Sequence, residues 1–163
     1  MISANFIIKD AAYNNDDAIY NAIHYITHNH TCPLFCYGIW PPTEENIIHK
    51  FETLRANLST FYSKTPCQQK LQHFWITFDT TYRLDFIISF IDNLALMIGK
   101  YYPTCYAIHE DQSSFHAHFV VSTTGHIPSQ PFLIDSNWAS HIKKIIRFAK
   151  KCSIILKEIH KNA

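Results

Sequence analysis

The stretch YAIHEDQSSFHAHFVVS, residues 106–122, predicts the centre of the fold. Its two apolar runs flank the polar segment DQSS, and this pattern is typical of a β-hairpin. Alternate residues of a strand point to the same face, so His116 and His118 present both imidazoles on one side of the sheet. If the turn comprises residues 111–114, the hairpin also brings His109 level with this pair. Three imidazoles that leave coordination positions open are typical of a catalytic metal site.

Histidine is frequent in this chain, and this leaves a second interpretation of the hairpin open. With eleven histidines in 163 residues, pairs separated by one residue also arise by chance in a half-exposed strand. Cys32 and Cys36 form another pair that could bind a metal ion, but no second thiol pair lies at the spacing of a zinc site. The five cysteines are an odd number, so we expect free thiols in a reducing compartment.

The elements around the hairpin predict one α+β domain over residues 1–163. The expected strands cover residues 3–9, 71–79, 104–110, 114–123 and a short segment at 131–136. The expected helices cover residues 14–30, 44–64, 83–102 and 137–161. Antiparallel hairpins with segregated helices form a two-layer sandwich. We therefore expect a central antiparallel sheet with helices mainly on one side, in a ferredoxin-like arrangement.

The composition is that of an ordinary globular protein, with 47% hydrophobic and 17% charged residues. The chain contains no apolar run long enough to span a bilayer, and its start lacks the charged-then-apolar order of a signal peptide. We therefore expect a cytoplasmic protein without a membrane segment. Only three glycines are present, and the absence of a glycine-rich phosphate-binding motif argues against the nucleotide-binding folds that use one.

The net charge of +1 gives no general attraction to nucleic acid, so any basic surface must be local. The segment HIKKIIRFAKK, residues 141–151, is the best candidate. Its basic side chains, which we expect to follow a phosphate backbone, are Lys143, Lys144, Arg147, Lys150 and Lys151. A solvated helix face is the alternative interpretation of the same residues.

The hairpin resembles the third motif of plasmid relaxases, the mobilisation nucleases of the HUH (His-hydrophobic-His) superfamily. That motif runs approximately apolar-His-x-Asp, four further residues, and His-x-His followed by an apolar strand. The residues of this chain that fall on it are His109, Asp111, His116 and His118. Ser122 stands where the family commonly carries asparagine.

Two further segments are similar to relaxase motifs, so the resemblance covers nearly the whole chain. The strand LQHFWITFD, residues 71–79, is similar to the family's His-Phe-x-x-Ser-Phe strand, with Thr77 in place of serine. The segment AIYNAIHYITH, residues 18–28, resembles the first motif, in which a tyrosine precedes an aliphatic residue, here Tyr25 and Ile26. The resemblance implies a nuclease fold of the HUH type.

The resemblance also implies metal-dependent, site- and strand-specific nicking and religation of DNA at an origin of transfer. This reaction initiates the conjugative transfer or mobilisation of a plasmid or mobile element. His109, His116 and His118 would hold the divalent ion, with Mg²⁺ or Mn²⁺ expected, although Ni²⁺, Cu²⁺ or Zn²⁺ also suits imidazoles. The implied partners are single-stranded DNA and accessory mobilisation proteins, because we expect this chain to comprise only the nuclease core.

The expected nucleophile is Tyr25, because this tyrosine matches the first motif. Tyr20 and Tyr13 remain alternatives, as does a nearby histidine such as His24, since helical periodicity does not separate Tyr25 from Tyr20. Both tyrosines could instead be boundary aromatics that cover the sheet.

Two further expected roles have plain structural alternatives. Asp111 orients one of the histidine ligands, or it only closes the hairpin turn. His73 lines the active site, together with Tyr20 and His24, or it is a satisfied, partly buried histidine.

Two other classes of function also remain open. A relaxase-like domain without cleavage activity would only bind DNA or a partner. A rolling-circle replication initiator shares the tyrosine chemistry, but it usually places its tyrosine after the His-x-His strand. No tyrosine follows His118 in this chain.

Overall fold

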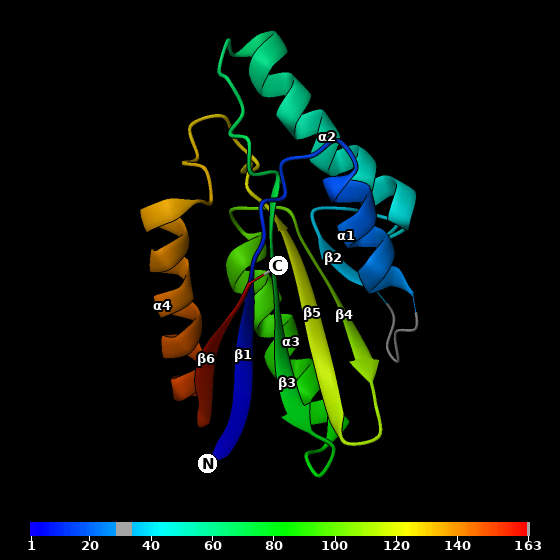
Figure 1. Cartoon of the computed structure of the whole chain (residues 1–163), viewed down its shortest axis with the longest axis vertical. Coiled ribbons are helices and arrows are strands. Elements are labelled where there is room, and N and C mark those ends of the chain that lie inside the picture. The colour runs from blue at the N-terminus through cyan, green and yellow to red at the C-terminus, as the bar shows by residue number, and fades with distance from the viewer. Residues whose placement is uncertain (29–33, 163) are drawn as a thin grey trace.

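The computed structural model describes residues 1–28 and 34–162 of the chain. The helices and strands of this part are arranged as shown in Figure 1. In chain order they are β1 (Ile2–Asp10), α1 (Ala18–Thr27), β2 (Phe35–Tyr37), α2 (Glu44–Phe61), β3 (Leu71–Asp79), α3 (Leu84–Gly99), β4 (Thr104–Glu110), β5 (Ser114–Ser122), α4 (Asp135–Lys151) and β6 (Ile154–Asn162).

The strands form one mixed sheet in the order β2-β4-β5-β3-β1-β6. Neighbouring strands are antiparallel except β1 and β6, which run parallel. The prediction of an α+β domain is confirmed. The prediction of an antiparallel sheet is wrong at this edge, because a segment that we expected to be helical adds β6 beside β1.

The hairpin of β4 and β5 lies inside the sheet and is formed by the predicted strands. His109 of β4 lies opposite His116 of β5. On the other side of β5, Trp75 and Thr77 of β3 lie opposite His118 and His116, respectively. Because side chains alternate along a strand, this register places the three histidines on one face.

The helices lie on both faces of the sheet (Figure 1). α3 and α4 pack on one face, where Phe74 stacks on Phe119 with ring centroids 4.7 Å apart. α1 packs on the opposite face, over Leu71 and Val120, and α2 lies against α1. This differs from the expectation that the helices gather mainly on one side. The cause is that β4 and β5 are apolar on both faces near α1, so both faces need a covering layer.

The C-terminal helix is shorter than the one predicted over residues 137–161. α4 ends at Lys151, and Ser153 adopts the left-handed backbone region with φ of 61°. In β6, the buried Leu156 alternates with Ile155, which is 51% exposed. The strand pairs with β1 over its whole length, so β-branched residues and sheet pairing prevail over the helical period.

Two shorter segments also differ from their predictions. No strand forms at residues 131–136. Residues 131–134 are irregular and lead into α4. The buried Leu133 donates its backbone N–H to the carbonyl of Thr123. Conversely, β2 forms between the first two helices, where no strand was predicted. None of the helices in the described part is long and apolar enough to cross a membrane.

The thiols described are free, as expected. Cys36 of β2 lies opposite the buried Cys105 of β4. Cys32, the other member of the CxxxC pair, lies outside the described residues.

The assignment of β6 makes a direct prediction for protein stability. Leu156→Ala should lower the free energy of unfolding by about 2–4 kcal/mol, because it removes a buried side chain and leaves a cavity. Ile155→Ala should change it by less than about 1 kcal/mol, because Ile155 is half-exposed. Urea unfolding followed by circular dichroism measures both values. Equal losses at the two positions would contradict the strand.

Candidate functional site

Three neighbouring strands form a histidine-rich surface, which we call the His face and which comprises His73 of β3, His109 of β4, and His116 and His118 of β5. Its three predicted ligands are His109, His116 and His118. The ring centroids of His109 and His118 lie 4.7 Å apart, and those of His116 and His118 lie 6.2 Å apart. The hairpin therefore places the three imidazoles on one face of the sheet, as predicted, while their binding of a common ion stays a prediction.

Tyr25 is placed against this face by α1. The apolar side of α1 is buried on the sheet, which leaves Tyr25 at the edge of the helix with 54% of its surface exposed. Its ring centroid lies 5.3 Å from that of His118 and 5.9 Å from those of His109 and His73. Residues far apart in the sequence thus meet at one hydroxyl-bearing ring.

The two alternative tyrosines are placed differently. Tyr20 stacks on His24, with ring centroids 5.4 Å apart and an interplanar angle of 13°. Tyr13 forms a hydrogen bond of 3.0 Å between its hydroxyl and Nδ1 of His73. Burial raises the pKa of Tyr13 to about 12, which makes its phenolate harder to form. Tyr25 is therefore the better placed candidate nucleophile of the three.

Asp111 serves both of its expected roles. Its Oδ1 accepts the backbone N–H groups of Ser113 and Ser114 and so closes the turn. Its Oδ2 lies 2.6 Å from Nε2 of His116. The hydrogen bond from His116, together with those of the turn, holds the pKa of Asp111 well below its usual range. The ionised carboxylate thereby fixes the orientation of the His116 ring, whose Nδ1 lies 3.0 Å from Oγ1 of Thr77.

His73 links His118 to Tyr13 through hydrogen bonds of its two ring nitrogens. Nε2 of His73 lies 3.4 Å from Nδ1 of His118, and Nδ1 of His73 bonds to Tyr13. Burial lowers the pKa of His73 to about 3 and that of His118 to about 2. Both rings therefore stay neutral at physiological pH, and neutral imidazole is the form that binds metals.

The donor set of the His face suits a divalent transition ion. His109 donates Nε2–H to the carbonyl oxygen of Ile26 at 3.1 Å, so the lone pair of its neutral ring is on Nδ1. If His118 donates Nδ1–H to His73, its lone pair lies on Nε2. Among the described residues, however, these rings are not among those whose ligand atoms converge within 4.8 Å. Metal binding at the His face therefore requires the imidazoles to rotate toward a common point.

The two buried histidines predict a loss of stability in acid. The unfolded chain binds protons at these residues below their usual pKa of 6.5, whereas the folded chain does not. The free energy of unfolding should therefore decrease as pH falls from about 6.5 toward 3. His73 alone should contribute about 2–3 kcal/mol of this loss between pH 7 and pH 4.5.

This loss is measured by urea unfolding at the two pH values, with a chelator present. His73→Gln, which removes one buried titrating ring, should lose less stability than the wild type. His49→Gln, at an exposed position of α2, should behave like the wild type. If His73→Gln loses as much stability as the wild type, His73 is not a buried neutral histidine.

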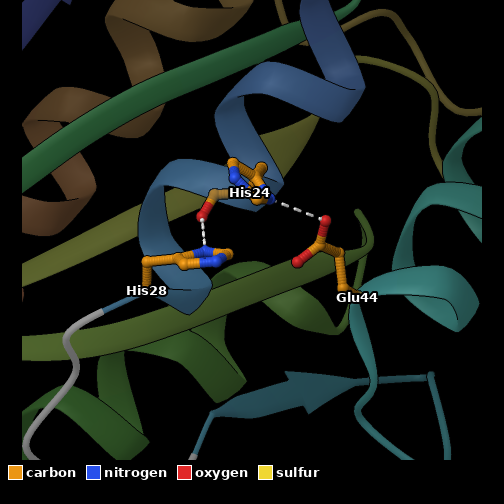
Figure 2. A group of neighbouring side chains, drawn as sticks. All are labelled: His24, His28 and Glu44. Carbon is orange, nitrogen blue, oxygen red and sulfur yellow. Dashed lines mark hydrogen bonds and ion pairs between the residues drawn. The ribbon is translucent and has the colours of Figure 1, made fainter.

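A second cluster lies at the end of α1, beside the His face. His24, expected to line the site, borders a pocket of about 420 Å³ together with Tyr25, His28 and His109. Figure 2 shows that the Nδ1 of His24 meets the carboxylate of Glu44, at 3.0 Å. The grouping of His28 and Glu44 with His24 was not predicted from the sequence. The available signal was the spacing of His24 and His28, four residues apart on one helix.

The predicted DNA-binding residues of α4 do not lie on the His face. α4 packs on the opposite face of the sheet, through Trp138, Ile142 and Ile145. Its exposed basic side chains are Lys143, Lys144, Arg147, Lys150 and Lys151. DNA contact by these residues stays a prediction, and the structure does not bring them to the histidines.

Other residues beside the His face were missed as candidate ligand contacts. A pocket of about 360 Å³ is lined by Lys9, Tyr13, Tyr25, His73 and Trp75, among others. Nζ of Lys9 lies 5.8 Å from the ring centroid of Tyr13. Nζ of Lys161, on β6, lies 5.4 Å from the ring centroid of Trp75.

The chain was compared with models of known protein families, with curated proteins and with solved structures. None of them matches. The chemistry of the His face is therefore inferred from its side chains and from the resemblance of their spacing to relaxase motifs.

Proposed function

We propose that the protein is a relaxase-like nuclease, which nicks and religates single-stranded DNA by tyrosine transesterification on the His face. It would act at an origin of transfer of a plasmid or mobile element. The observation that supports this most is the position of Tyr25, whose ring lies within 6 Å of three histidine rings, those of His73, His109 and His118. The resemblance to relaxases implies magnesium or manganese as the ion, although three imidazoles alone suit nickel, copper or zinc better.

The proposed reaction exchanges one phosphodiester bond for another. The hydroxyl oxygen of Tyr25 attacks the scissile phosphorus, and a new P–O bond to the tyrosine forms. The bond between phosphorus and one deoxyribose oxygen breaks, and this oxygen takes up a proton while the tyrosine loses one. Because bond energy is conserved in the phosphotyrosine, the freed hydroxyl can reverse the reaction and religate the strand.

An unperturbed tyrosine hydroxyl, with a pKa near 10, is a weak nucleophile at neutral pH. A divalent ion bound by His109, His116 and His118 would polarise the phosphate and favour the phenolate. The chain's own contribution is positioning. Asp111 holds the ring of His116 by the hydrogen bond of 2.6 Å.

Trp75 and Lys9 provide a surface for the DNA strand next to Tyr25. Bases of single-stranded DNA stack on exposed aromatic rings, and basic side chains track the phosphates. The half-buried ring of Trp75 stacks on that of His118, with centroids 5.4 Å apart, and Nζ of Lys161 of β6 lies 5.4 Å from the centroid of Trp75. A strand that crosses this surface would pass directly in front of the proposed nucleophile.

Trp75→Ala should weaken the binding of single-stranded DNA roughly 5- to 100-fold, because it removes a stacking platform. Trp40→Ala, at a ring that is 88% exposed in a loop outside the site, should leave affinity unchanged. Fluorescence anisotropy with a labelled oligonucleotide pool measures both variants, and circular dichroism verifies their folding. Equal affinities for wild type and Trp75→Ala would place the strand elsewhere.

The proposed function is tested by incubating the protein with a pool of single-stranded oligonucleotides and manganese. We expect cleaved strands and a protein–DNA product that survives denaturing electrophoresis. Chelation of the metal, or pairing of the same pool into duplexes, should abolish both. Cleavage without a covalent product would contradict transesterification.

A second candidate function is that of a relaxase-like module that binds DNA without cutting it. The observation that favours it is the side-chain arrangement, since His109 bonds to the carbonyl of Ile26 rather than converging with His116 and His118. In that case the pool would bind the protein, but manganese would neither bind the histidines nor promote cleavage.

A further inference from the structure

The cluster of His24, His28 and Glu44 lies where the last turn of α1 meets the first turn of α2. Figure 2 shows the two imidazoles, at the end of α1, and the carboxylate, at the start of α2, turned toward one another. In the part of the chain that the structure describes, it is the group of at least three histidine, cysteine or acidic side chains whose ligand atoms lie within 4.8 Å of one another. We propose that this cluster is a second metal site, separate from the His face, that binds a divalent transition ion such as zinc.

The separation of His24 and Glu44 suits two ligands of a single ion. Two ligand atoms that each lie about 2.1 Å from a zinc ion are roughly 3.0–3.4 Å apart, depending on their angle. Nδ1 of His24 and Oε1 of Glu44 are 3.0 Å apart. The proton between them is the one that the ion would replace.

The third ligand is already in the appropriate tautomer. Nδ1–H of His28 donates to the carbonyl oxygen of His24 at 2.7 Å, so the lone pair of the neutral ring is on Nε2. Such a hydrogen bond from the non-ligating nitrogen orients the histidine ligands of metal sites. The hydroxyl of Thr27, 2.8 Å from Oε2 of Glu44, holds the carboxylate in a similar way.

The donor set also determines the kind of ion. Two imidazoles and one carboxylate favour zinc, nickel or copper over magnesium, which prefers oxygen ligands and retains its water. The cluster is partly open, because His28 is exposed and Glu44 is half-buried. An ion held by three protein ligands would thus keep a position for water.

The position of the cluster gives the ion a role in the fold. It would tie the end of α1 to the start of α2, and Tyr25 lies on α1 between the two histidine ligands. The bound ion would therefore stabilise the turn that presents Tyr25 to the His face. This inference goes beyond the proposed nuclease and does not depend on it.

Zinc alone is the probe for the test, and the background is the double variant His109→Ala/His116→Ala, which disables the His face. Equilibrium dialysis of this protein should find about one zinc ion per chain, and zinc should raise its melting temperature. Adding His28→Ala or Glu44→Gln should weaken zinc binding at least about 100-fold, because each substitution removes one of only three ligands. This effect should exceed that of losing a residue that only orients a ligand. Adding His49→Ala, at an exposed histidine of α2, should leave it unchanged.

The alternative outcomes overturn the proposal. The cluster is no metal site if the background protein binds no zinc, or if it binds zinc equally well with His28→Ala and with Glu44→Gln. Because His28 is exposed, His28→Ala should keep the fold, which circular dichroism verifies. In addition, cobalt bound to the wild-type chain should show visible absorption bands that change in Glu44→Gln. Bands that stay the same would equally contradict the assignment.

Discussion

Tyr25→Phe should eliminate the covalent protein–DNA product and lower strand cleavage at least about 10³-fold. The substitution removes only the hydroxyl oxygen that attacks phosphorus. The ring would keep its position beside His73, His109 and His118, so DNA binding and folding should be preserved. Denaturing electrophoresis of oligonucleotides labelled at either end, incubated with manganese, measures both the cut strand and the linked one.

Tyr20→Phe is the matched control for this prediction. Tyr20 lies on the same helix and is similarly exposed, at 50% of its surface, but its ring stacks on His24. It should retain wild-type activity. An adduct that persists in Tyr25→Phe and disappears in Tyr20→Phe, Tyr13→Phe or His24→Ala would move the nucleophile to that residue.

His116→Ala should lower metal-dependent cleavage at least about 100-fold, because it removes one of three proposed ligands from the ion. Asp111→Asn should have a smaller effect, about 10- to 100-fold, since it only weakens the orientation of the His116 ring. Manganese binding should also weaken more in His116→Ala than in Asp111→Asn. The paramagnetic resonance signal of the free ion measures this binding. Cleavage assays at several manganese concentrations separate lost affinity from lost turnover.

His49→Ala provides the control for general effects of removing a histidine, because His49 lies on α2 and not on the His face. It should bind manganese and cleave DNA like the wild type. If His116→Ala cleaves as fast as the wild type at all manganese concentrations, the three histidines do not form the catalytic metal site.

The hairpin could be predicted because its information is local. The alternation of side chains in β4 and β5, and a short polar turn between them, are enough to place His109 opposite His116. The tyrosine that meets them was predicted from the spacing of a motif. Periodicity alone leaves Tyr20 and Tyr25 equivalent, and only the packing of α1 on the sheet separates them.

The C-terminal segment could not be predicted because local and tertiary preferences conflict there. Ile142, Ile145 and Ala149 follow a helical period, and Leu156, seven residues after Ala149, is spaced as though the same helix continued. Neither glycine nor proline marks the break, which instead occurs at Ser153 with a positive φ. The segment becomes a strand because it pairs with β1, which lies at the opposite end of the sequence.

The side-chain contacts around the site also could not be predicted from the sequence. Tyr13 and His73 are 60 residues apart, and His24 and Glu44 are 20 residues apart. These pairs lie on different elements and have no common periodicity. They become neighbours only when α1 is placed on the sheet and α2 on α1.

The most direct test of the central proposal is to identify the residue that carries DNA. The wild-type protein would be incubated with the single-stranded pool and manganese, digested with nuclease and protease, and analysed by mass spectrometry. We predict a nucleotide phosphate linked to the tyrosine of the peptide that contains Tyr25. A phosphate on another residue, or cleaved DNA without any linked peptide, would contradict the account.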